Sequence, residues 1–405
     1  MLIELKIKNF LSFKDETRFL MTAVKSFKEH LQENIIETER EFDLLKSSAI
    51  YGINGGGKSN FMYAINVMTN VIFNSYSNSL VKEDNRPDQR YQFKLNSETE
   101  NANTMFEVSF LIDSNIYRYG FEINGYEIKK EWLYRKIERE VPLFIRNADS
   151  SIFDINEESF EEGIKYKEDV NSNVLFISHL AQNNQKISRL IFNWFSNVNV
   201  ISGVHEQNYD KFTAKLLGSD KNFKKWATSV LRYLEISNIE AGEKDGEIIT
   251  HHNRFDKDNL LINTVPFTAI MESEGTKKLI HILGPIYDSL RNGKVLFIDE
   301  FDSKLHPNLS KKLIDFFNKL NVKNAQVIIS GHDTNLLDKE IFRRDQIWFV
   351  DKDQFGASEL YSLSEFNAKT VRNTSAFDKK YLDNDFGASD TIELDEQIID
   401  LLYGK

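Results

Sequence analysis

The sequence predicts an α/β fold that combines a parallel sheet with an antiparallel β subdomain and a helical insertion. Three observations favour this fold class. Short apolar runs alternate with helical stretches after about residue 262, alternating strands turn at Asn124–Gly125, and helical patterns dominate residues 155–260. The chain of 405 residues is too long for one ordinary core, so we expect two domains or one domain with a large insertion.

The expected elements fall into three blocks. Residues 1–150 form strands around one helix, residues 151–260 form a mainly helical insertion, and residues 261–405 return to strand–helix alternation. In the first block, a short apolar strand is cut off by Gly52, and helical spacing follows it at Phe61, Ile65, Met68 and Ile72. In the third block, the short apolar strands are 294–299, 325–330 and 345–350.

The composition indicates a globular protein, with 41% hydrophobic and 28% charged residues. The net charge of −11 disfavours a surface coated for nucleic acid, although it leaves a local basic groove open. The absence of cysteine excludes disulfides, thiolate zinc sites and cysteine nucleophiles. The N-terminus has no signal-peptide pattern, and no apolar run approaches the roughly 18 residues of a membrane span, so we expect a cytoplasmic protein.

The stretch GINGGGKS, residues 52–59, fits the P-loop pattern G-x-x-x-x-G-K-[ST]. Its glycines let backbone N–H groups turn toward phosphates, Lys58 adds a positive charge, and Ser59 offers a hydroxyl to Mg²⁺. The helix that begins here points its positive end at the same anion. We therefore expect ATP and Mg²⁺ as ligands. The predicted nucleotide-binding residues of this loop are Gly52, Asn54, Gly55, Gly56, Gly57, Lys58, Ser59 and Asn60.

A strand that ends in carboxylates complements the P-loop. Four apolar residues precede Asp299 and Glu300, and ligands bind at the carboxyl ends of such strands. Asp299 is expected to hold Mg²⁺ through water, and Glu300 is expected to orient and deprotonate the attacking water. Without the P-loop, a strand end that meets solvent would explain both residues equally well. The 241 residues from Lys58 to Asp299 imply that a whole lobe is inserted between the two halves of the site.

The turn at residues 271–275 precedes this strand and opens a helical pattern. Ser273 and Gly275, followed by that helix, resemble the signature motif of ABC-type ATPases. The resemblance implies that both residues bind an ATP molecule held by a second protomer, so that two protomers sandwich the nucleotide. An ordinary helix N-cap at Ser273 or Thr276 is the alternative. Further along, Gly284–Pro285 predicts a kink in the helix.

Two features after the carboxylate strand extend this resemblance. His332 follows the next apolar strand, and it matches the histidine that contacts the γ-phosphate and acts as a switch in ABC-type ATPases. Residues 301–307 match the D-loop. The resemblance implies that Asp302 and Ser303 report across a dimer interface.

The order of these motifs resembles the compact ABC-type ATPases of bacterial anti-phage systems, the abortive-infection AbiL and Rlo-type proteins, which are relatives of RecF and of SMC heads. The resemblance implies an ABC-type ATPase head made of residues 1–150 and 261–405, with a role as sensor or regulator in anti-phage defence. It implies a homodimer or dimer-based oligomer and a separately encoded effector, such as a nuclease or a TOPRIM-like protein. It also implies a Q-loop glutamine that binds metal, for which Gln92 and the nearby Gln89 are candidates. Asp385 stands where the family pattern has arginine.

Other interpretations stay open. RecF-like relatives bind DNA and serve repair, so nucleic acid remains a candidate partner, whereas a scaffold that binds ATP without turnover would not need Glu300. The pair His251–His252 is interpreted as a loop feature and not as a metal site. Basic residues that could form local patches, or only a solvated face, are Lys221, Lys224, Lys225, Arg343 and Arg344.

Overall fold

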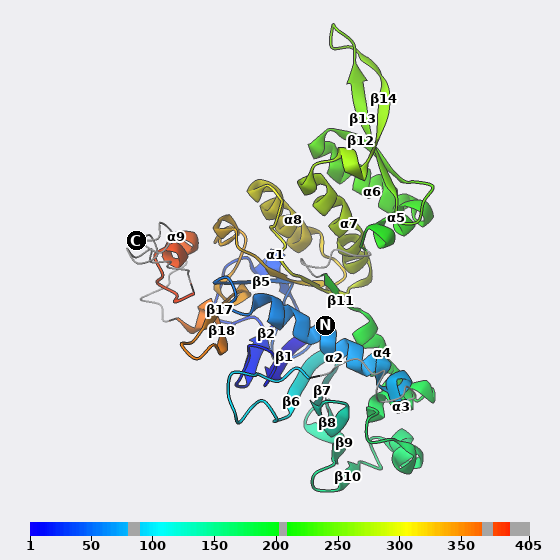
Figure 1. Ribbon diagram of the computed structural model, residues 1–405, viewed down its shortest axis with the longest axis vertical. Coiled ribbons are helices and arrows are strands. Elements are labelled where there is room, and N and C mark those ends of the chain that lie inside the picture. Colours follow the sequence, from blue (N-terminus) through cyan, green and yellow to red (C-terminus); the bar gives the residue numbers. More distant parts are fainter. Residues whose placement is uncertain (80–89, 202–208, 367–375, 389–405) are drawn as a thin grey trace, which may run out of the picture.

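The computed structural model describes residues 1–79, 90–201, 209–366 and 376–388. The two large sheets of the described chain are a seven-stranded antiparallel sheet and a six-stranded, mainly parallel sheet (Figure 1). The antiparallel sheet has the order β10-β9-β8-β7-β6-β1-β2. Its strands are β1 (Leu2–Lys8), β2 (Thr17–Leu20), β6 (Thr104–Ile112), β7 (Asn115–Asn124), β8 (Glu127–Lys136), β9 (Glu140–Asn147) and β10 (Ile152–Ile155).

The antiparallel sheet confirms the β subdomain that the first block predicted. β7 and β8 are joined at Asn124–Gly125, where Gly125 has φ +58°, a conformation that glycine adopts without steric cost. β1 lies between β6 and β2, with Leu5 opposite Val108. The start of the chain is therefore an interior strand of this sheet.

The parallel sheet has the order β11-β15-β16-β5-β17-β18, and β18 runs antiparallel to β17. Its side chains alternate between two cores, because successive residues of a strand point to opposite faces. In β15, Val295 and Phe297 lie in one core, and Leu296 and Ile298 lie in the other. The strands are β5 (Ser47–Gly52), β11 (Val198–Ile201), β15 (Val295–Ile298), β16 (Gln326–Ser330), β17 (Ile347–Lys352) and β18 (Ser358–Ser362).

Helices cover both faces of the parallel sheet. α2 (Lys58–Ser79) packs on one face together with the antiparallel sheet, and the four apolar positions predicted for this helix are all buried there. α7 (Glu274–Asn292) and α8 (Pro307–Leu320) pack on the other face (Figure 1). The predicted α/β fold class is therefore confirmed.

Residues 151–260 are less uniform than the helical insertion that the sequence predicted. β11 belongs to the parallel sheet beside β15, and the segment rich in Gly, Asp and His forms part of a three-stranded sheet. The helical pattern of residues 178–198 is broken at Asn184, which has φ +59°. β11 was not predicted, because a strand of only four residues is too short to show an alternating pattern in the sequence. The elements are the 3₁₀ segment η2 (Glu161–Asp169), α3 (Phe176–Gln182), α4 (Lys186–Ser196), α5 (Tyr209–Ser219), α6 (Lys221–Leu231), β12 (Ile236–Ala241), β13 (Ile248–Phe255) and β14 (Leu261–Thr268).

Helix α7 is continuous through Pro285, where the sequence predicted a kink. A proline removes the helical hydrogen bond to the carbonyl four residues earlier, which is that of His281. Thr213 on α5 donates its hydroxyl to this carbonyl at 3.2 Å. A Cβ atom at Gly284 would lie 2.4 Å from Thr213 Oγ1, so glycine allows α5 to approach closely enough to replace the missing donor.

The last described segment contains α9 (Phe377–Leu382), which covers β17. Tyr381 stacks on Phe349, with ring centroids 5.6 Å apart. Asp385, which departs from the family pattern, forms a 2.7 Å ion pair with Lys380. This acidic residue therefore has a local partner on the same segment.

Candidate site at the carboxyl edge of the parallel sheet

The P-loop lies between β5 and α2, as the sequence predicted. Gly52 has φ +152°, and a Cβ atom there would lie 2.0 Å from the carbonyl oxygen of Val350. Gly57 has φ +123°, and its Cβ would lie 2.5 Å from Ser358 Oγ. Only glycine fits these two positions, so β17 and β18 fix the path of the loop.

Lys58 and Ser59 begin α2 with different surroundings. The Lys58 side chain is buried, and its ammonium donates to the carbonyl oxygens of Gly52 at 2.8 Å and Ile53 at 3.1 Å. The charge therefore lies inside the curve of the loop. Ser59 is exposed in the first helical turn, where its hydroxyl is accessible to a cation. The Asn60 side chain is bonded within the protein, since its amide donates to Ser12 Oγ at 2.8 Å.

The strands that carry the predicted residues end at one edge of the sheet. Ile298 pairs with Ile329, and Ser330 pairs with Ile50, so β15, β16 and β5 finish at the same level. The carboxyl edge of a parallel sheet is the usual place for a ligand. The fold thus brings the P-loop, the carboxylates after β15 and the segment after β16 to the same edge.

Ser330, which the sequence analysis missed, connects the two carboxylate residues. Its hydroxyl donates to Asp299 Oδ1 at 2.5 Å and accepts the backbone N–H of Glu300 at 2.8 Å. Glu300 has φ +49°, a conformation that costs energy outside glycine and that recurs at functional sites. The hydrogen bond from Ser330 uses only Oδ1 of Asp299. The other carboxylate oxygen of Asp299 and the Ser59 hydroxyl are oxygen ligands of the kind that Mg²⁺ prefers. The donor set therefore fits Mg²⁺.

Asp302 fixes the segment that carries His332. Its carboxylate accepts the backbone N–H of His332 at 2.7 Å and also that of Asp333. Asp302 is buried, whereas the His332 side chain is exposed beyond the sheet edge. The predicted D-loop is therefore bonded to the predicted switch segment within one chain. In the sequence, Asp302 is visible only as an acidic residue shortly after the buried strand β15. No local pattern connects it with His332.

The turn that resembles a signature motif lies at the start of α7. Ser273 is the N-cap residue, because its Oγ accepts the backbone N–H of Thr276 at 3.1 Å. A Cβ atom at Gly275 would lie 2.6 Å from the carbonyl oxygen of Lys304, and Lys304 also donates to Glu274 at 3.2 Å. The turn and the D-loop thus form one continuous surface. A capping role is established for Ser273, and nucleotide binding by Ser273 and Gly275 stays a prediction.

Gln92 lies near the P-loop through its neighbours. Leu11 donates its backbone N–H to the carbonyl of Tyr91 at 2.6 Å, and Ser12, the next residue, contacts the first turn of α2. The Gln92 side chain is buried. Metal binding by Gln92 stays a prediction, and Gln89 lies outside the described residues.

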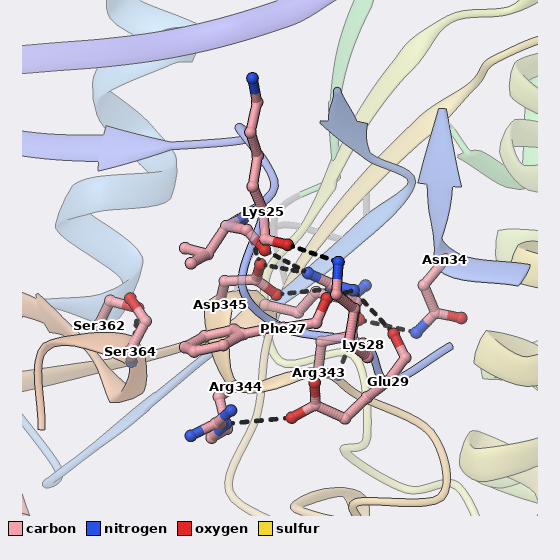
Figure 2. Close-up of polar contacts among 12 residues, drawn as sticks. Lys25, Phe27, Lys28, Glu29, Asn34, Arg343, Arg344, Asp345, Ser362 and Ser364 are labelled. Carbon is pink, nitrogen blue, oxygen red and sulfur yellow. Dashed lines mark hydrogen bonds and ion pairs between the residues drawn. The ribbon is translucent and has the colours of Figure 1, made fainter. Parts of the chain in front are cut away.

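Arg343 does not lie at the surface, where both interpretations of the sequence, a local patch or a solvated face, had placed it. Arg343 is fully buried; its guanidinium forms a 2.7 Å ion pair with Asp345 and donates to the carbonyls of Val24, Phe27 and Glu29 (Figure 2). Arg344 lies 3.8 Å from the centroid of the Phe27 ring. Both arginines therefore hold the loop at residues 24–29 in place. This role could not be predicted, because the loop is more than 300 residues away in the sequence. The short elements that follow this loop are α1 (Leu31–Asn34), β3 (Ile35–Ile36) and β4 (Leu44–Leu45).

His251 and His252 lie in β13 and not in a loop, which corrects the sequence interpretation. Their side chains bond different carboxylates, His251 with Glu240 at 3.0 Å and His252 with Glu272 at 2.8 Å. Among the described residues, no group of three or more His, Asp or Glu side chains could hold a metal ion.

Comparison with known families decides the kinship. Residues 47–338 match the family described as "AAA domain, putative AbiEii toxin, Type IV TA system". The chain belongs to this family. The matched range runs from β5 past His332, so it contains every motif assigned above from the P-loop onward. This membership confirms the predicted relation to ATPases of the abortive-infection group.

Three solved structures are also similar to the chain. The SMC head domain from Thermotoga maritima has a TM-score of 0.44 and 14% identity, over 89% of this chain and 98% of that one. The second is an SMC head bound to the C-winged helix domain of ScpA, with a TM-score of 0.44 and 12% identity over 89% of this chain and 97% of that one. The third is an Smc head domain with an extended coiled coil bound to the C-terminal domain of ScpA, derived from Pyrococcus furiosus, with a TM-score of 0.44 and 11% identity over 89% of this chain and 96% of that one. No curated protein matches the chain. In the described part of the chain, no helix is long and apolar enough to cross a membrane.

Proposed function

We propose that the protein is a cytoplasmic ATPase in which two copies close around ATP and Mg²⁺. The observation that carries this proposal is the convergence of the P-loop, Asp299, Glu300 and His332 at one sheet edge. The backbone of the loop and Lys58 would hold the phosphates, while Ser59 and Asp299 would hold Mg²⁺, which neutralises phosphate charge when bound. Glu300 would orient the attacking water and accept its proton.

The placement of two helices supports the proposed shared site. α2 directs its N-terminus at its own P-loop, whereas α7 lies on the opposite face of the sheet and carries Ser273 at an exposed N-terminus. A second helix N-terminus attracts a second anion. In the proposed dimer, Ser273 and Gly275 of each copy contact the ATP held by the other copy. His332 of the same chain as the P-loop contacts the γ-phosphate.

The family description supports the biological role. It names a toxin of a type IV toxin–antitoxin system. We infer that the ATP-bound dimer is the regulatory state in an abortive-infection response to phage. In this scheme the dimer acts on a separately encoded effector, either a nuclease or a TOPRIM-like protein.

Replacing Glu300 with glutamine is expected to trap the ATP-bound dimer. The amide keeps the shape of the side chain but cannot accept the proton of water, so ATP stays bound. Size-exclusion chromatography in ATP and Mg²⁺ should show the variant as a dimer and the parent largely as a monomer. The double variant Glu300→Gln/Lys58→Ala is the control and should remain monomeric. A Glu300→Gln protein that stays monomeric in ATP would refute the dimeric site.

A second candidate function, nucleic-acid binding, is favoured by a groove beside α6. The groove has a volume of about 530 Å³, and every residue that lines it is polar. Lys224 pairs with Glu240 at 3.4 Å, and among the described residues no ion pair is formed by Lys221, Lys225 or Arg232. The lining residues are Lys221, Lys224, Lys225, Thr228, Ser229, Arg232 and Asn238.

Phosphate binding at this groove should depend on salt, because each neutralised phosphate releases counterions. The affinity for a single-stranded oligonucleotide, measured by fluorescence anisotropy, should fall steeply with salt. The double variant Lys221→Glu/Lys225→Glu should bind at least ~10-fold more weakly and show a flatter salt dependence. Lys311→Glu/Lys319→Glu, on α8, changes the net charge equally and serves as the control. Equal losses in both double variants would leave only a general charge effect and reject the groove.

A further inference from the structure

A buried carboxylate lies directly before the turn at Ser273. The Glu272 side chain is only 7% exposed, and its Oε1 accepts a hydrogen bond from His252 Nε2 at 2.8 Å. The same oxygen accepts a second bond from the hydroxyl of Thr250. A carboxylate can only accept, so His252 carries its proton on Nε2 in this contact. Both donors belong to β13.

Strand β13 is itself well fixed. It is the central strand of the sheet β12-β13-β14, and its Thr250 and His252 pair with Phe267 and Val265 of β14. The His252 ring lies over the Phe267 ring, with centroids 4.4 Å apart. β14 then continues through the 3₁₀ turn Ala269–Met271 into Glu272. The turn is therefore joined to the hairpin covalently through β14 and by the hydrogen bonds of Glu272.

The packing of the turn against the hairpin is incomplete. A cavity of about 200 Å³ lies between them, lined among others by Thr250, Ile270, Glu272 and Lys277. Ile270 is 91% exposed, so it adds little apolar burial. The two hydrogen bonds of Glu272 cross this loosely packed region.

We propose that Glu272 is a positioning residue that clamps the signature turn to the three-stranded sheet. Through Thr250 and His252 it orients Ser273 and the N-terminus of α7 toward the ATP held by the second copy. This inference rests on the proposed shared site. It makes ATP turnover depend on the β13–β14 hairpin.

The variant Glu272→Ala tests the clamp. We expect kcat to fall at least tenfold, while the affinity of the P-loop for a fluorescent ATP analogue stays within twofold. Glu272→Gln keeps an oxygen that can accept both bonds and should retain most of the turnover. The matched control is Glu240→Ala, because Glu240 lies on β12 of the same sheet and bonds His251 of β13 and Lys224 of α6. This control should change kcat by less than twofold.

A second variant covers the case in which Glu272→Ala fails to fold. Thr250→Val/His252→Leu removes both donors but keeps apolar bulk in β13, and it should lower kcat to the same extent. Subunit mixing then locates the defect. Glu272→Ala should regain activity when mixed with Lys58→Ala, whose own signature turn is intact, and should not regain activity when mixed with Ser273→Arg.

Distinct outcomes separate the clamp from the shared site. If Ser273→Arg abolishes turnover while Glu272→Ala stays within twofold of the parent, the clamp is wrong and the shared site stands. If Lys58→Ala rescues Ser273→Arg but does not rescue Glu272→Ala, the clamp is also wrong. If Ser273→Arg turns over normally, the shared site itself fails.

Discussion

Replacing Lys58 with alanine is expected to lower the affinity for ATP at least ~100-fold, because charge-assisted hydrogen bonds to phosphate are each worth about 1.5–3 kcal/mol. The ammonium lies inside the loop, 2.8 Å from the Gly52 carbonyl, where it can meet the phosphates. The fold should survive, since the side chain adds no apolar packing to either core. Isothermal titration with ATP and Mg²⁺ measures the affinity, and the thermal midpoint checks the fold.

Lys352→Ala is the matched control for this prediction. Lys352 also donates to a carbonyl of the P-loop, that of Gly55 at 3.1 Å, but it does so from the exposed side. Its loss should change the affinity less than ~3-fold, as expected for an exposed charge. Tight ATP binding by Lys58→Ala would show that the glycine-rich loop is not the phosphate site.

Mixing two inactive variants is expected to restore ATP turnover. Lys58→Ala removes the P-loop charge but keeps the signature turn. Ser273→Arg keeps the P-loop but replaces the exposed cap hydroxyl with bulk and positive charge. Each variant alone should lose nearly all activity, because both composite sites of its dimer carry a lesion. In the mixed dimer one site carries both lesions and the other carries none.

The recovered rate should reach at most about half of the parent rate per mixed dimer if the two sites fire independently. A steady-state ATPase assay after subunit exchange measures it. If one intact site cannot fire alone, the rate stays low, but the mixed dimer still forms and the Glu300→Gln dimer persists in ATP. Absence of both recovery and any ATP-dependent dimer would reduce Ser273 to a helix cap.

Local patterns in the sequence were sufficient for much of the fold. The strand–loop–helix around Lys58, the buried strand before Asp299 and the hairpin at Asn124–Gly125 were all predicted within contiguous stretches. Each of these features is encoded by a period or a turn residue that only its neighbours need to satisfy. Their assembly into an α/β fold followed from the alternation of strands and helices.

Tertiary structure alone decided several contacts among residues far apart in the chain. Arg343, expected at the surface, is buried because Asp345 and three carbonyls of the N-terminal loop satisfy its guanidinium. β11 joined the parallel sheet by pairing with β15, which its four residues could not signal.

The candidate site shows the same division. The sequence by itself was enough to predict the residues for phosphate and metal chemistry, namely Lys58, Ser59, Asp299 and Glu300. Only the tertiary structure placed Ser330 between the Asp299 carboxylate and the backbone N–H of Glu300, bonded Asp302 to the His332 segment and joined His252 to Glu272. A side-chain hydrogen bond between distant segments leaves no period or spacing in a single sequence, because it depends on how independently folded elements meet.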